Sequence, residues 1–300
     1  MHKYFTASDW GIVWPTNASS PIASPPPPVP SDHGFLAAAA PVGVLFAISM
    51  TIVAIAFFGG MIGELACSWR LSYSPSGAAF SIWGLIFLWS IGSCVYQLLN
   101  GFDEIDTYTS KPRVNLLEMA AWLLSAVWVV AFSAERGVDP IRAVTTAMFF
   151  LVAAMFCAMG AAVTEGAWRN DHVGRILGVG VPYSLLAGWL WAASGVSVGI
   201  VVKAWTVPAD SRCRNDQRRH YTTLLRADPL EWYGWESWAP LLLATGISAI
   251  AFLLPDPILP LPMIWAIRNM KGHFKNWLAL ELLMVTVLAA IVEISLGLGV

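Results

Sequence analysis

The sequence predicts an all-α protein, a polytopic bundle of transmembrane helices. Hydrophobic residues make up 57% of the 300 residues and charged residues only 12%, about half of the ~25% that is usual in soluble domains. The mean hydropathy of +0.63 agrees with this composition. The apolar residues are also gathered in runs that approach or exceed the ~20 residues needed to cross a bilayer.

Eight hydrophobic segments follow one another along the chain. They cover residues 35–62, 76–100, 115–133, 141–164, 176–205, 238–254, 257–269 and 277–298. We expect the first six and the last to span the membrane. The seventh is too short and carries Pro257, Pro260 and Pro262, so we expect a broken or re-entrant segment, or a helix kinked at its prolines. The number of spanning helices is therefore seven or eight.

Two hydrophilic stretches divide the chain. Residues 1–33 are rich in proline and serine and predict a disordered tail. Residues 206–237 form a basic hydrophilic loop. The predicted organisation is therefore a tail, a helical core over 34–205, the loop, and C-terminal membrane segments over 238–300.

The distribution of basic residues predicts the orientation in the membrane. With eight crossings, 12 of the 17 lysine and arginine residues fall on the side that holds the 206–237 loop. The positive-inside rule then makes this loop cytosolic and both termini lumenal or extracellular. The glycosylation sequon at Asn17 would lie on the side where it could be used. The sequence leaves open which membrane holds the protein.

The ionisable residues exclude several classes of function. A net charge of −2 gives no basic field for nucleic acid, and the four cysteines and five histidines show no metal-ligand spacing. We therefore expect no metal and no required cofactor. A carboxylate within a span costs about 2.5–3.5 kcal/mol and often marks a proton pathway, so Glu118 or Glu281 would serve an alternative function, a proton-coupled secondary transporter. A membrane enzyme acting on a lipid or tetrapyrrole is a weaker alternative, because no nucleophile–base pair is evident.

Tryptophan is unusually frequent, with 16 residues. Most lie at or beyond the ends of the predicted spans, as in the aromatic belts of membrane proteins. Four that lie within the predicted hydrophobic segments need another explanation. They are Trp83, Trp128, Trp189 and Trp265.

Helical spacing places aromatic and small residues on defined faces. In the second span Phe80, Trp83 and Phe87 share one face. A stripe of small residues beside them predicts close approach of another helix. It consists of Gly77, Ser81 and Gly84. Similar lines run along the third and fifth spans, through Trp122, Ser125, Trp128 and Phe132 and through Trp189, Ala193 and Ser197. Helix packing and a pocket for a flat apolar ligand both explain such faces.

Four stretches together resemble the TspO/MBR family of tryptophan-rich sensory or translocator proteins. "SPSGAAFSIWGLIFLW" (74–89) is similar to the family's second-helix signature. "LLSAVWVVAF" (123–132) and "VPYSLLAGWLWAASGVSV" (181–198) resemble its third- and fifth-helix patterns, and "DPILPLPMIWAI" (256–267) resembles a segment of its longer members. These matches occur in the family's order.

The resemblance implies a five-helix core with two or three added C-terminal segments, and an interior cavity for a tetrapyrrole- or sterol-like ligand. Carried over one by one, the cavity-lining residues would be Phe80, Trp83, Ser125, Trp128, Trp189 and Ser197. Ser125 and Ser197 stand where the family usually has asparagine, so we expect the ligand to be held by shape and stacking more than by amide hydrogen bonds. The expected role is binding, sensing or translocation in the lipid bilayer rather than catalysis. Family members often dimerise, and the sequence leaves this open.

Overall fold

The computed structural model describes most of the hydrophobic part of the chain. The described residues are 33–69, 71, 73, 76–100, 112–133, 139–166, 173–206, 238–270 and 274–296. The predicted tail and the basic loop, with Asn17, lie outside the described residues except at the helix ends His33 and Thr206. The orientation in the membrane therefore stays a prediction.

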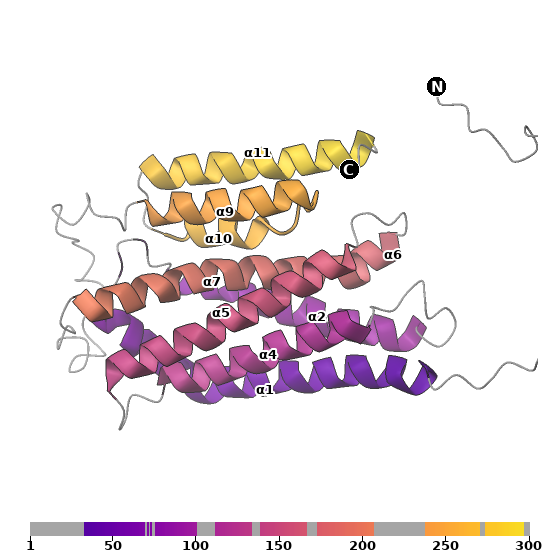
Figure 1. Cartoon of the computed structure of the whole chain (residues 1–300), viewed down its shortest axis with the longest axis horizontal. Coiled ribbons are helices and arrows are strands. Elements are labelled where there is room, and N and C mark those ends of the chain that lie inside the picture. Colours follow the sequence, from indigo (N-terminus) through magenta and orange to yellow (C-terminus); the bar gives the residue numbers. More distant parts are fainter. Residues whose placement is uncertain are drawn as a thin grey trace, which may run out of the picture. The chain divides into compact units, whose positions relative to one another are not determined.

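Within the described residues every regular element is helical, which confirms the predicted fold class (Figure 1). The elements are α1 (His33–Ser68), the 3₁₀ turn η2 (Gly77–Ser81), α2 (Ile82–Asn100), α4 (Pro112–Ser133), α5 (Pro140–Glu165), α6 (Val173–Arg175), the π-helical turn η4 (Ile176–Gly180), α7 (Val181–Thr206), α9 (Ala239–Leu253), α10 (Leu261–Arg268) and α11 (Phe274–Leu296). In the described part of the chain, six helical spans are long and apolar enough to cross a membrane. The protein is a multi-pass integral membrane protein.

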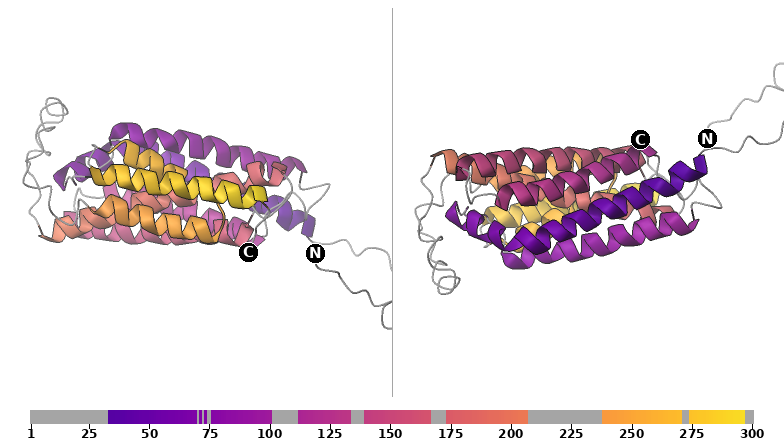
Figure 2. Two further views of the ribbon diagram at one scale, coloured as in Figure 1. Left: turned by 90° about the horizontal axis from the view of Figure 1, so that it is seen from above. Right: turned by 90° about the horizontal axis from the view of Figure 1, so that it is seen from below.

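Helix α7 is the centre of the bundle. It packs against α2 and α5 on one side and against α9 and α10 on the other, while α11 lies outside α9 and α10 (Figures 1 and 2). The span that contains α7 is 67% buried, whereas that of α11 is 22% buried. Most of the surface of α7 is therefore used for packing or for lining a site.

The N-terminal half of the bundle is held by packing and by a few buried polar contacts. α5 packs along α4, and α1 lies beside α4, where the Thr51 hydroxyl donates to the carbonyl of Trp122 at 2.7 Å. α5 has well-defined ends. The Asp139 carboxylate accepts from the N–H of Ile141, Pro140 occupies the first turn, and Gly166 ends the helix at φ 52°.

A proline explains the π-helical turn that precedes α7. Pro182 has no N–H, so the carbonyl of Leu177, five residues earlier, lacks its π-helical partner. The indole N–H of Trp89, on α2, donates to this carbonyl at 2.8 Å. A side chain of the neighbouring helix thus satisfies a backbone group that the proline leaves free.

The C-terminal segments include two short helices, α9 and α10, joined by a non-helical turn. α9 has 15 residues, about 22 Å at 1.5 Å per residue. It is shorter than the six candidate spans, and the full span expected over 238–254 stays a prediction. α10 has only eight residues, which confirms that the 257–269 segment is too short to span. α10 runs back toward the end of the bundle where α9 starts, and α11 starts from that same end (Figure 1). We call α9, residues 254–260 and α10 the re-entrant hairpin.

The turn of this hairpin is buried, and one carboxylate satisfies its backbone. Oδ1 of Asp256 accepts the N–H groups of Ile258 and Leu259 at 2.9 and 3.0 Å. Oδ2 accepts the hydroxyl of Ser184, on α7, at 2.5 Å. Asp256 is itself buried. Non-helical backbone inside a membrane protein needs such internal partners, and Asp256 both supplies them and joins the turn to α7.

The predicted close-packing stripe on the second span is not used for packing. A Cβ added to Gly77 or Gly84 would meet no atom within 4 Å, and both residues, with Ser81, are exposed. The close approach occurs on α7 instead. A Cβ at Gly188 would overlap the carbonyl oxygen of Leu259, and one at Gly195 would overlap Leu243 of α9. Glycine therefore lets the re-entrant hairpin lie directly against α7.

We predict that Gly188→Ala destabilises the protein strongly and that Gly84→Ala does not. The new methyl group at Gly188 meets backbone, which cannot move aside as a flexible side chain would, so the hairpin must shift. At Gly84, alanine lacks any clash and favours the helix by about 0.5–1 kcal/mol. Thermal unfolding in detergent measures both. Equal unfolding midpoints for the two variants would contradict the close approach of α7 and the hairpin.

Candidate ligand cavity

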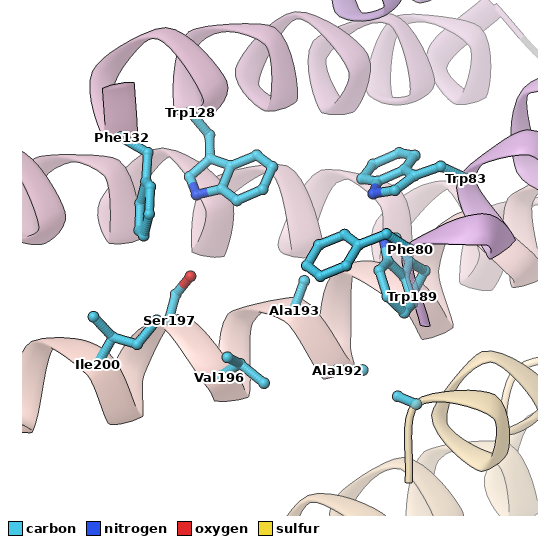
Figure 3. Close-up of a pocket in the computed structure, with 11 residues that line it drawn as sticks. Phe80, Trp83, Trp128, Phe132, Trp189, Ala192, Ala193, Val196, Ser197 and Ile200 are labelled. Carbon is cyan, nitrogen blue, oxygen red and sulfur yellow. The ribbon is translucent and has the colours of Figure 1, made fainter. Parts of the chain in front are cut away.

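An apolar cavity of about 70 Å³ lies where η2, α2, α4, α7 and α10 meet (Figure 3). Its walls are mainly aromatic and aliphatic, and no charged side chain of the described residues lines it. The lining residues are Phe80, Trp83, Trp128, Phe132, Trp189, Ala192, Ala193, Val196, Ser197, Ile200 and Ala266. α7 contributes the largest share of them, which follows from its central position.

A connected group of aromatic rings forms one end of the cavity. Trp83 stands edge-on to Trp189, with ring centroids 6.0 Å apart at 80°, and stacks on Phe87 at 5.3 Å. Phe80 also stands edge-on to Trp189, at 6.1 Å and 81°. Phe87 in turn stacks on Trp122 of α4. These are favourable ring geometries, so the aromatic face of the second span joins three helices and fixes the orientation of Trp83.

Phe80 differs from the other aromatic residues of the wall in its exposure. Its side chain is 45% exposed, whereas Trp83 is 7% exposed. Phe80 belongs to the 3₁₀ turn η2 rather than to α2. It therefore marks the open side of the cavity.

Five of the six residues expected to line a common cavity do so. They are Phe80, Trp83, Trp128, Trp189 and Ser197. The predicted line along the fifth span is also present, since Trp189, Ala193 and Ser197 all face the cavity from α7 (Figure 3). Ser125 does not line it. The Ser125 hydroxyl donates to the carbonyl of Ala121 in its own helix at 2.8 Å, and the residue is fully buried.

Two tryptophans of the wall have buried indole N–H groups without an acceptor. Neither Nε1 of Trp128 nor Nε1 of Trp189 has a hydrogen-bond partner among the described residues. Their side chains are only 6% and 3% exposed. A buried donor without a partner costs about 1–3 kcal/mol. The hydroxyl of Ser197 also points into the cavity (Figure 3). The wall thus presents donors that a ligand could satisfy.

The sequence interpretation missed several lining residues. Ala192, Val196 and Ile200 belong to the same helix as Trp189, and helical spacing from that residue would have found Val196 and Ile200. Ala266, from α10, carries no signal in the sequence, because its place depends on the turn of the re-entrant hairpin.

A second polar site lies beside the aromatic group. The Glu118 side chain is 2% exposed, the indole of Trp122 donates to it at 3.4 Å, and Tyr183 also hydrogen-bonds to it. Arg113 is exposed and makes no ion pair with it in the described part of the chain. Glu281 is exposed on α11. The structure therefore distinguishes the two carboxylates, because only Glu118 is enclosed by the bundle.

Comparisons with known proteins agree with this architecture. Residues 36–210 match the model of a family described as TSPO-like protein, which is more than half of the 300 residues. No curated protein and no solved structure matches the chain. The family match covers α1 to α7 and ends before the re-entrant hairpin and α11.

We predict that Ala193→Val leaves the protein as stable as before or stabilises it. The added carbons enter the cavity that Ala193 lines, and filling a cavity commonly contributes about 0.5–2 kcal/mol. The matched control is Ala147→Val on α5, where the side chain is completely buried and lines no part of the cavity. Overpacking there should cost about 1–3 kcal/mol. If both variants lower the thermal midpoint equally, the space beside Ala193 is not present in solution.

Proposed function

Because the chain belongs to the TSPO-like protein family, we propose that it binds a flat hydrophobic small molecule in this cavity, for sensing or translocation. The ligand is tetrapyrrole- or sterol-like and carries a hydrogen-bond acceptor. One observation carries the proposal: a wall of aromatic rings contains two buried indole donors, Trp128 and Trp189, without acceptors among the described residues. A ligand carbonyl or hydroxyl oxygen would supply what these donors lack.

The size of the cavity specifies how such a ligand binds. Drug-sized ligands occupy pockets of roughly 300–1,000 Å³, and the cavity measures about 70 Å³. Only one edge of a tetrapyrrole or sterol therefore fits while the walls keep their positions. Phe80 is the half-exposed lining residue, and its ring contacts Trp189 by an edge. The ligand enters by displacing Phe80 and stacks against Trp83 or Trp189.

We predict saturable quenching of tryptophan fluorescence when protoporphyrin is titrated into the purified protein, with a sterol as competitor. Trp83→Ala and Trp189→Ala should weaken binding at least tenfold, because each removes a ring of the wall. Trp128→Phe and Trp189→Phe keep a ring but remove the donor, so we expect about a three- to tenfold loss, equivalent to one neutral hydrogen bond of 0.5–1.5 kcal/mol.

The matched control for the phenylalanine variants is Trp205→Phe. Trp205 is 68% exposed and does not line the cavity, so its replacement should leave the affinity unchanged. The absence of saturable quenching, or an unchanged affinity in Trp83→Ala and Trp189→Ala, would refute the cavity as the binding site.

The buried position of Glu118 favours a second candidate function, proton-coupled transport. Its carboxylate accepts from the neutral indole of Trp122, and intramembrane carboxylates of this kind mark proton pathways. Trp122 also packs against Trp83 and Phe87 of the cavity end. Gain or loss of a proton at Glu118 would change the hydrogen bond to Trp122 and, through it, the aromatic group.

We predict that Glu118→Gln abolishes the dependence of protoporphyrin uptake on a pH gradient in proteoliposomes, if uptake is proton-coupled. Glutamine keeps an acceptor for the Trp122 indole but cannot exchange a proton. Glu281→Gln, on the exposed face of α11, is the control and should keep the wild-type dependence. Gradient-driven uptake that persists in Glu118→Gln would exclude a proton-carrying role for this residue.

A further inference from the structure

The re-entrant hairpin contributes to the cavity although it lies outside the family match. The match ends at residue 210, and ten of the lining residues precede that point. Ala266 of α10 is the remaining lining residue among those described, and it is 2% exposed. The part of the chain that the family model does not cover therefore closes one side of the candidate site.

Two hydrogen bonds join the C-terminal part of α10 to residues 76–79, which precede Phe80 at the open side of the cavity. The backbone N–H of Ser76 donates to the carbonyl of Asn269 at 3.0 Å, and the indole of Trp265 donates to the carbonyl of Ala79 at 3.0 Å. Ala79 directly precedes Phe80 in the sequence. α10 is thus joined to the turn that carries the residue at the cavity mouth.

The beginning of the hairpin's return segment is held equally closely. The Asp256 carboxylate accepts the hydroxyl of Ser184, and the backbone at Leu259 lies where a Cβ of Gly188 would be. α10 therefore cannot move closer to α7. Because both ends of the segment are held, backbone contacts set the distance between α10 and the cavity. On the α10 side, the size of the side chain at position 266 then decides how far the cavity extends.

We propose that the re-entrant hairpin is a selectivity element, in which Ala266 sets the length of the flat ligand that the cavity accepts. The proposal rests on the proposed function, since it assigns the size limit of that same site. A larger aliphatic side chain at position 266 would fill part of the cavity on its α10 side, and alanine leaves this space free for a ligand. Ligands with a longer flat part need this space, and short ligands do not.

The test uses three uncharged probes of increasing length, the acetyl derivatives of naphthalene, anthracene and tetracene. Each is flat and carries one carbonyl acceptor for the indole donors. Binding to the full-length protein is measured by quenching of tryptophan fluorescence. Ala266→Leu should lower the affinity for the four-ring probe at least tenfold and change the affinity for the two-ring probe less than twofold. Ala266→Gly should shift the preference in the opposite direction.

The matched control is Ala249→Leu, the same substitution on the exposed face of α9, which should leave all three affinities unchanged. A variant in which the hairpin is loosened, Asp256→Asn, should reduce the discrimination between the probes without abolishing binding of the smallest. If the wild type binds the probes and the Ala266 variants shift all three affinities equally or not at all, the selectivity role is wrong and the proposed function stands. If the wild type binds none of them and no protoporphyrin, the proposed function itself fails.

Discussion

The architecture depends on how the chain reverses direction inside the bundle. Residues 254–260 leave the helical conformation at a buried position, where water cannot satisfy the backbone. Asp256 solves this locally, because one of its oxygens accepts two backbone N–H groups and the other accepts the Ser184 hydroxyl of α7. The turn is therefore both internally satisfied and attached to the most buried helix. The return of α10 toward the cavity, and the start of α11 at the same end of the bundle as α9, follow from this reversal.

Helix α7 combines two roles that usually compete. One face approaches the re-entrant hairpin so closely that a Cβ at position 188 would overlap the backbone of Leu259, and one at position 195 would overlap the Leu243 side chain. The other face carries Trp189, Ala193 and Ser197 toward the cavity. Gly188 and Trp189 are adjacent in the sequence, so the side chain that stacks in the cavity follows directly on the point of closest backbone contact. A shift of the hairpin would therefore be transmitted to the cavity without an intervening flexible segment.

The sequence predicted the features that depend on residues close together in the chain and missed those that depend on contacts between distant segments. The spanning helices were predictable because an apolar run of sufficient length has few alternatives in a membrane. The aromatic walls were predictable because helical spacing places Phe80 and Trp83 on one face, and likewise Trp189 and Ser197. Small residues were ambiguous. Gly84 and Gly188 are both glycines within apolar helical segments, so the sequence does not tell them apart. They differ in what lies opposite: nothing within 4 Å of a Cβ at Gly84, and the backbone of Leu259 at Gly188. The Ser125 hydroxyl donates to a carbonyl of its own helix instead of lining the cavity, a hydrogen bond that any helical serine can make. Ala266 and Asp256 depend on a reversal of the chain that hydropathy does not encode.

The polar groups of the cavity limit the chemistry of any ligand bound there. The buried indoles of Trp128 and Trp189 donate and do not accept, and the single hydroxyl of Ser197 is neutral. Among the residues that the structure describes, no charged one lines the wall. An ionised group placed inside would lose its hydration without gaining a counter-charge, which costs far more than one hydrogen bond returns. An uncharged oxygen acceptor on a flat ring system suits this wall. A ligand with ionised side arms would have to keep them at the open side, beside Phe80, with only its flat apolar edge between the tryptophans. The same wall therefore favours the insertion of one edge over complete enclosure, in agreement with the small volume of the cavity.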